Sequence, residues 1–439
     1  MWQYWSVFLV IRVSLRVVIS QTSSTDGARV WEKHIGVLPV SWTEQGDEWE
    51  FHLANALGGP GYLEGQGSSM GRGDVILGPP PMSGMQCSLR VRRDSGGIAC
   101  IVFGDERPGN EDDAARWREA AEVAVEKVGR HDHDFSWRAI VGPGPTGSEW
   151  RRPGPLAATV TIGPVELIPG GVQMRELAGF AHGQIDSPGP ERRTWPVIAS
   201  GTIRSYNEDY VRHQAQGQAH RICALLSLIS GIWWTLRSGP HVWLAGTPQR
   251  RPIAVPQSVG PWEATHYAGQ PLPADFNVYA GGEFLPIPAW TEQAWNLMDT
   301  DENIKKAVHG CYEAMGLEAN HPSVAFLMYV ATIEGIGTRF IDLKHCKSCG
   351  SRTGAGLRFR EALATVLPPD EAKSLGNAAY RDYRSKTGHE ARLFGGEDTF
   401  GYSSFSMFTF DEADVFFYAY LMPIRQACRQ IIGKILREA

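Results

Sequence analysis

Apolar side chains recur with helical spacing throughout the last third of the chain. From Pro322 onward, Val324, Leu327 and Met328 fall on one helix face, and a proline at the first helical position lacks only an N–H that would have no partner within the helix. Helices joined by mostly short connections form an antiparallel bundle, which we expect over 290–439. Similar patterns predict helices over 294–317, 357–366, 370–389 and from the capping box at Thr409–Glu412 to the end of the chain, with a kink at Pro423.

The region 28–208 has a different residue pattern, in which Gly and Pro separate short apolar runs. VWEKHIGVLPVSW, WEFHLA, IACIVFG and AATVTIGPVELI have the length and composition of strands. They predict an antiparallel sheet, sandwich or barrel, interrupted by one helix over 111–128.

A helix is also expected over 210–236, polar at first and then apolar nearly all round. Because such a helix must be covered on every side, we expect it to pack between domains. A Pro/Gly-rich connector over 240–288 follows. The chain is therefore predicted to be α+β, with a lead-in over 1–27, a β-rich N-terminal domain over 28–208, a helix and connector over 209–289 and a C-terminal antiparallel helical bundle over 290–439.

Composition is that of a globular protein, with 43% hydrophobic and 21% charged residues in 439. The net charge of −6 does not by itself suggest a nucleic-acid partner. Seven thinly spread cysteines indicate a reducing compartment, so we expect a cytoplasmic protein. In the lead-in, Arg12 and Arg16 interrupt the apolar residues, which favours neither a membrane span nor a signal peptide. A secreted β-domain protein would need that segment to be removed.

Arg384 and His389 form a spaced pair of residues that can do acid–base and phosphate chemistry. The pattern counted is an arginine followed by a histidine after four to six intervening residues. Chance alone produces about three such pairs in a chain of this length and composition, which is the usual false-positive risk of short motifs. The sequence holds four, with the others at Arg29/His34, Arg175/His182 and Arg339/His345. The spacing therefore carries little information without its context.

The context of Arg384 and His389 is distinctive. LGNAAYRDYRSKTGHE, HPSVAFLMYVATIEGIGTRF and CKSCG with LRFREAL resemble segments of HEPN domains, particularly the Apea-like group, over about 291–438. The resemblance implies a HEPN-like helical bundle that dimerises, and a metal-independent endoribonuclease with Arg384 and His389 catalytic. It also implies supporting roles for Glu334, Tyr383 and Ser385, and a function in bacterial defence or as a toxin. Ser385 departs from the family, since many ribonuclease members carry Asn, Asp or His there.

The residue types suit RNA cleavage without a catalytic cofactor. A neutral imidazole can take the proton of a 2′-hydroxyl, and a guanidinium can stabilise the charge that grows on the phosphoryl oxygens. Positions five apart on an ideal helix point about 140° away from each other, so one chain would hold the two side chains awkwardly as a pair. The dimer that the resemblance implies, with these segments facing, would bring two arginines and two histidines to one cleft. The segment 344–392 contains ten Lys or Arg and five Asp or Glu, and this local positive charge would favour binding of RNA. A solvent-exposed helix face can have the same composition.

Three questions stay open at this level. Cys346 and Cys349 form a CxxC pair that would need two further ligands to hold a structural zinc, and two reduced cysteines fit equally well. Glu334 either orients Arg384 or joins the cleft, or else its carboxylate is satisfied by Arg339 or a backbone group. The bundle is either an endoribonuclease or a catalytically silent dimerisation or nucleotide-binding module whose N-terminal domain senses a ligand.

Overall fold

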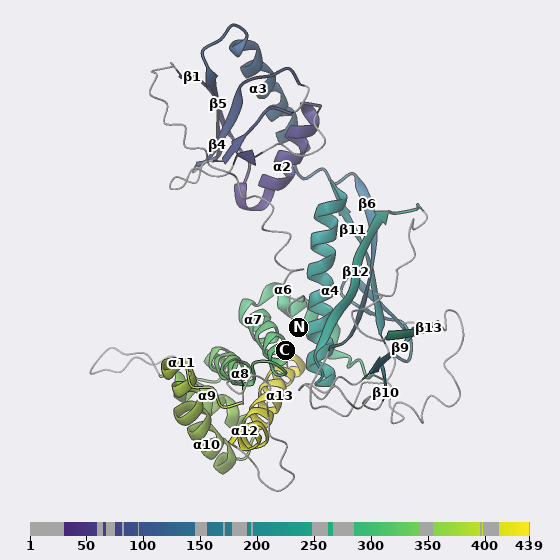
Figure 1. Cartoon of the computed structure of the whole chain (residues 1–439), viewed down its shortest axis with the longest axis vertical. Helices are drawn as coiled ribbons and strands as arrows, with labels where there is room; N and C mark the ends of the chain where they lie inside the picture. Colours follow the sequence, from purple (N-terminus) through teal and green to yellow (C-terminus); the bar gives the residue numbers. More distant parts are fainter. Residues whose placement is uncertain are drawn as a thin grey trace, which may run out of the picture. The chain divides into compact units, whose positions relative to one another are not determined.

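Two compact units, 1–132 and 133–439, make up the computed structural model, and each is described by itself (Figure 1). The unit boundary differs from the predicted ones near residues 208 and 290. The structure describes residues 30–58, 65–66, 75–80, 83–94, 96–144, 156–169, 172–177, 191–194, 196–247, 262–266, 285–341, 354–395, 397 and 412–438. The lead-in and the Thr409 end of the predicted capping box lie outside them.

The first unit is a five-stranded antiparallel sheet with two helices packed on each other. Trp49 and Trp117, one from each helix, are fully buried, and the Trp117 indole N–H donates to the Cys87 carbonyl at 2.9 Å. In sheet order the strands are β1 (Val30–Leu38), β5 (Gly97–Asp105), β4 (Ser88–Asp94), β3 (Val75–Leu77) and β2 (Gly65–Gln66), and the helices are α2 (Trp42–Ala56) and α3 (Asn110–Lys127).

The prediction of a strand at WEFHLA was wrong, because this run lies inside helix α2. Trp49, His52 and Leu53 are three and four residues apart and all are buried, so the run has helical rather than alternating periodicity. The helix predicted over 111–128 is confirmed as α3.

The second unit begins with a five-stranded antiparallel sheet, as expected for this half of the chain. Its order is β12 (Trp234–Leu244), β6 (His133–Pro143), β11 (Val197–Ser205), β8 (Val165–Pro169) and β7 (Val160–Ile162). A smaller sheet pairs β9 (Val172–Leu177) with β10 (Glu191–Thr194) and β13 (Trp262–His266).

Helix α4 (Glu208–Ser230) ends earlier than the sequence pattern predicts. Gly231 takes a left-handed conformation, with φ of 75°, which L-residues with a Cβ rarely adopt. The chain then enters β12 at Trp234, so the last three residues of the expected helix belong to a strand. The predicted connector likewise starts within β12.

The helical bundle consists of α6 (Trp290–Thr300), α7 (Glu302–Leu317), α8 (Pro322–Ile336), a short 3₁₀ turn (Gly337–Arg339), α9 (Ala355–Ala364), α10 (Pro369–Asn377), a π-helix η2 (Ala378–Arg384), α11 (Ser385–Glu390), α12 (Glu412–Phe416), a second π-helix η4 (Phe417–Leu421) and α13 (Met422–Glu438). A C-terminal helical region is thus confirmed. The π-helix just before Pro423 lies where a kink was expected, since proline supplies no N–H to the α-helical ladder.

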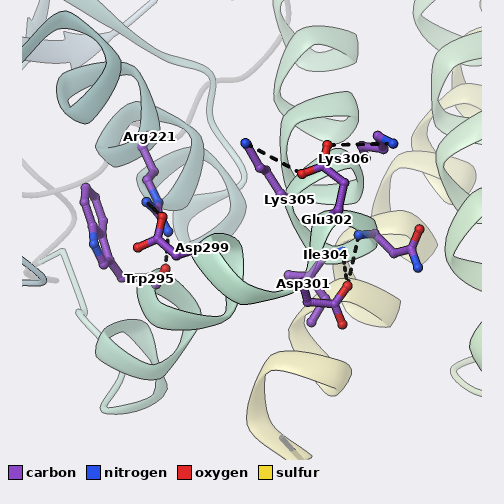
Figure 2. Close-up of polar contacts among 9 residues, drawn as sticks. Arg221, Trp295, Asp299, Asp301, Glu302, Ile304, Lys305 and Lys306 are labelled. Atoms are coloured by element: carbon purple, nitrogen blue, oxygen red, sulfur yellow. Dashed lines mark hydrogen bonds and ion pairs between the residues drawn. The ribbon is translucent and has the colours of Figure 1, made fainter. Parts of the chain in front are cut away.

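The single helix expected over 294–317 is two helices, α6 and α7. Asp301 leaves the helical conformation and caps α7, accepting from the backbone N–H groups of Asn303 at 2.9 Å and Ile304 at 3.1 Å. Figure 2 shows this cap beside a second contact, in which Arg221 of α4 bonds Asp299 of α6 at 2.7 Å and lies over the Trp295 ring at 4.0 Å.

One hydrophobic core runs through the sheet, α4 and the bundle. The second half of α4, from Ile222 to Leu228, is buried on nearly every side, because β6, β11 and β12 contact it together with α7 and α13. Helix α4 is therefore covered on nearly every side, as expected, although the sheet and the bundle that cover it belong to one compact unit rather than to two domains. A domain boundary at residue 290 would cut through this core.

Two arginines of α13 hold the C-terminal end of α4. Arg429 donates from Nε and Nη2 to the Leu228 carbonyl at 3.1 and 2.8 Å, and Arg425 donates to the Gly231 carbonyl. Arg425 is only 4% exposed, and its Nη1 lies 3.2 Å from an oxygen of Glu318, which also accepts from the Tyr329 hydroxyl. Positive side chains at the C-terminal end of a helix interact favourably with the negative end of its dipole and donate hydrogen bonds to its last carbonyls.

We expect Glu318→Leu to lower the free energy of unfolding by about 3–5 kcal/mol, because it leaves the Arg425 guanidinium buried without its counter-charge. The double variant Glu318→Leu with Arg425→Met should cost less than the sum of the two single changes. Urea unfolding of the full chain, followed by tryptophan fluorescence, measures both. Strictly additive effects would contradict a coupled buried pair.

Candidate active site

The segment that carries Arg384 is a π-helix flanked by α-helices. The sequence predicts one continuous helix from 370 towards 389, and the structure widens it over Ala378–Arg384 before α11 resumes. π-helical turns are rare and occur frequently at functional sites. This geometry sets the directions in which the side chains of the segment point.

Tyr383 anchors the segment in an aromatic cluster. Its ring lies 4.4 Å from that of Tyr420, 4.7 Å from Phe394, 5.3 Å from Phe416 and 5.9 Å from Phe326, measured between centroids. Such packing stabilises through both apolar burial and ring geometry. The structure thus packs the partly buried Tyr383 against the core beside Arg384, where it fixes the backbone position of the arginine.

Arg384 lies between a carboxylate and an aromatic ring. Its Nε is 3.7 Å from Oε1 of Glu334 on α8, and its guanidinium carbon is 5.1 Å from the centre of the Tyr380 ring. The two charged side chains are 29% and 13% exposed, so water screens their attraction only partly. Of the roles considered for Glu334, the structure favours the contact with Arg384, since Arg339 pairs with Asp301.

Tyr380 belongs to this site although the motif does not include it. Burial raises the pKa of its phenol, and the nearby Glu334 charge raises it further. The hydroxyl therefore stays protonated at neutral pH and acts as a hydrogen-bond donor. Its position four residues before Arg384 was the only sequence signal that linked the two residues.

His389 lies in the last turn of α11 and is exposed. The helix ends at Glu390, and the residue that follows it, Ala391, has a φ of 54°. Arg384 is directed towards α8 while His389 reaches solvent, in keeping with the wide angle expected between them. Among the described residues no contact joins the two. Ser385 is half-buried at the start of α11.

The loop after α11 is fastened to the start of α8. Glu397 accepts from the Ser323 backbone N–H at 2.6 Å and from the Gly395 N–H at 3.0 Å, while the Ser323 hydroxyl accepts from the Phe394 N–H at 2.7 Å. A carboxylate at a helix N-terminus is stabilised by the helix dipole. Helix α8 therefore holds the segment twice, through Glu334 and through this loop.

The predicted zinc ligands Cys346 and Cys349 lie outside the described residues, so the zinc site stays a prediction. Cys87, Cys100, Cys223, Cys311 and Cys428 are free and buried, and burial raises the pKa of Cys100 to about 12. Within the described ranges no three His, Cys, Asp or Glu side chains gather as metal ligands. In that same part of the chain, no helix is both long and apolar enough to cross a bilayer.

Removing the Arg384 charge should destabilise the protein. We expect Arg384→Met to lower the free energy of unfolding by about 1–3 kcal/mol, since the largely buried Glu334 carboxylate loses its partner. Arg381→Met is the matched control: this arginine is 82% exposed, bonds only its neighbour Asp382 among the described contacts, and should show no measurable change. Equal effects of the two substitutions in urea unfolding would rule out a stabilising Glu334–Arg384 contact.

Comparison of the chain with protein-family models, curated proteins and solved structures finds no match. The similarity to HEPN domains consequently rests on the short segments around Glu334, Leu357 and Arg384. Any functional conclusion must come from the geometry of these residues.

Proposed function

We propose that the protein is a metal-independent endoribonuclease of HEPN type that acts as a homodimer, with Arg384 and His389 as its catalytic residues. One observation carries the proposal. Arg384 is held between Glu334 and Tyr380, and His389 is exposed five residues later on the same segment. A fixed cation and an accessible imidazole are the two groups that cleavage by an internal nucleophile requires.

In the proposed reaction, His389 removes the proton from a ribose 2′-hydroxyl. The 2′-oxygen then attacks the adjacent phosphorus, and the bond from phosphorus to the 5′-oxygen breaks. The leaving 5′-oxygen takes up a proton from the protonated His389 of the facing copy, which gives a 2′,3′-cyclic phosphate and a 5′-hydroxyl. Arg384 donates hydrogen bonds to the phosphoryl oxygens while their negative charge increases. The protein's own groups supply both proton transfer and charge stabilisation, so no metal ion enters the sequence of steps.

A second copy would complete the site. Arg384 and His389 point in different directions within one chain, so an arginine and a histidine from facing copies are better placed to act on one phosphate. Five exposed apolar side chains among the described residues of the bundle support such pairing, since exposed apolar area is what a second copy would cover. They are Val324 of α8, Leu357 of α9, Leu393 after α11, Val415 of α12 and Tyr418 of η4, which are 37%, 38%, 39%, 44% and 64% exposed.

The alternative is a catalytically silent HEPN module for dimerisation or nucleotide binding. It is favoured by Ser385, which stands where many ribonuclease members have a stronger polar group, and by the engagement of Arg384 with Glu334. In this alternative the specificity would come from the first unit.

The two proposals differ in the effect of His389→Ala on RNA cleavage. With EDTA present, we expect the wild type to cleave RNA to 2′,3′-cyclic ends and the variant to be about 10²–10⁴-fold slower, the usual contribution of an acid–base residue. His309→Ala is the control, because this exposed histidine lies on α7 away from the segment. Sedimentation should show the same dimer for all three proteins. Equal cleavage by wild type and His389→Ala would leave the silent module as the better proposal.

A further inference from the structure

A cavity of about 370 Å³ lies beside the catalytic segment. The first turn of α9, the end of α10 and the start of the π-helix form its walls, and Tyr380 and Arg381 line it. Its volume is at the lower end of the range of small-molecule sites, roughly 300–1,000 Å³. It has space for a single small group rather than a large ligand.

The cavity is positively charged. Arg360 and Arg381 line it, and no carboxylate does among the described residues. Arg360 has a neutral partner, since its Nη1 lies 3.3 Å from the Asn377 side-chain oxygen. Arg381 bonds Asp382 at 3.0 Å but is 82% exposed, so it can exchange this neighbour for a ligand. Two guanidinium groups in one cavity favour an anion with several oxygens, of which phosphate is the commonest biological example.

Three glycines, at 354, 356 and 376, keep the cavity open. A Cβ on Gly356 would lie 3.4 Å from the Tyr380 ring, so a longer side chain there would occupy space that a ligand would need. The ring and the neighbouring Leu357 form an apolar part of the wall. A nucleotide combines a flat base with a phosphate, so it matches a cavity with an aromatic wall and basic groups. Proteins that bind single-stranded nucleic acid typically use aromatic and basic side chains together.

Tyr380 connects the cavity to the catalytic arginine. Its ring lines the cavity and also lies under the Arg384 guanidinium, with 5.1 Å between the guanidinium carbon and the ring centre. A strand with its scissile phosphate on Arg384 would therefore bring a neighbouring nucleotide to Tyr380.

We infer that this cavity is a subsite for one nucleotide of the RNA strand next to the scissile phosphate, with Arg360 and Arg381 on its phosphate and the Tyr380 wall beside its base. The inference rests on the proposed ribonuclease function for the identity of the strand. A free nucleoside monophosphate has the same chemistry, and the experiment must separate these two sources. The subsite would give the enzyme a preference for the nucleotide at that position.

Equilibrium binding tests the subsite without cleavage. The probes are a fluorescent 2′-O-methyl octanucleotide of mixed sequence, which has no free 2′-hydroxyl to react, and the four nucleoside 3′-monophosphates. Gly356→Leu fills the cavity, and Arg360→Gln removes one charge. Gly217→Leu is the matched control, because this helical glycine of α4 is exposed and a Cβ there meets no atom within 4 Å. Thermal unfolding of each variant verifies that it folds.

We expect both cavity variants to bind the octanucleotide roughly tenfold more weakly than wild type, which is within the range measured for loss of one base contact. Arg360→Gln should also reduce the salt dependence of binding, since one phosphate contact is lost. Gly217→Leu should bind as wild type does. Unchanged octanucleotide binding in both cavity variants would overturn the subsite, even if cleavage depends on His389. Weaker binding of the monophosphates alone would also overturn it, by indicating a site for a free nucleotide.

Cleavage does not enter this measurement, so the two proposals fail separately. If His389→Ala cleaves RNA normally while Gly356→Leu weakens octanucleotide binding, the catalytic proposal is wrong and the nucleotide subsite remains.

Discussion

The second unit depends on the need to cover helix α4 on every side. Its second half is apolar around the whole circumference, so neither the sheet nor the bundle alone can bury it. Its last carbonyls also need partners, and Arg425 and Arg429 of α13 supply them. The last helix of the chain thus closes a core that begins with β6. The bundle is therefore one part of a larger body and shares its stability with the sheet.

Helix α8 connects this core to the candidate site. Tyr329 on α8 bonds the Glu318 carboxylate that balances Arg425, and five residues later on the same helix Glu334 meets Arg384. At its other end Ser323 fixes the loop that follows α11. A single helix therefore joins the buried ion pair, Arg384 and the loop that follows α11, which is the support that a preorganised site requires.

The sequence allowed the helices of the bundle to be predicted because their buried faces repeat with a helical period. It could not reveal breaks that depend on single residues: Asp301 divides one expected helix by capping the next, and Gly231 ends α4 before its apolar run ends. The π-helix has no local signature either, since Tyr383 is held there by aromatic rings that are distant in sequence. For the same reason Tyr380 was missed, whereas Glu334 was found from its segment.

The contact with Glu334 changes how Arg384 can act. A guanidinium offers five N–H donors in a planar fork, and the carboxylate approaches at Nε. The edge formed by the two Nη groups is separate from that contact and has the geometry for two hydrogen bonds to a phosphate. Glu334 offsets part of the cost of keeping the cation half-buried and restricts its rotation. In the proposed reaction, an arginine so held would need little reorganisation when charge develops on the phosphate, and this is the main electrostatic advantage that a protein has over water.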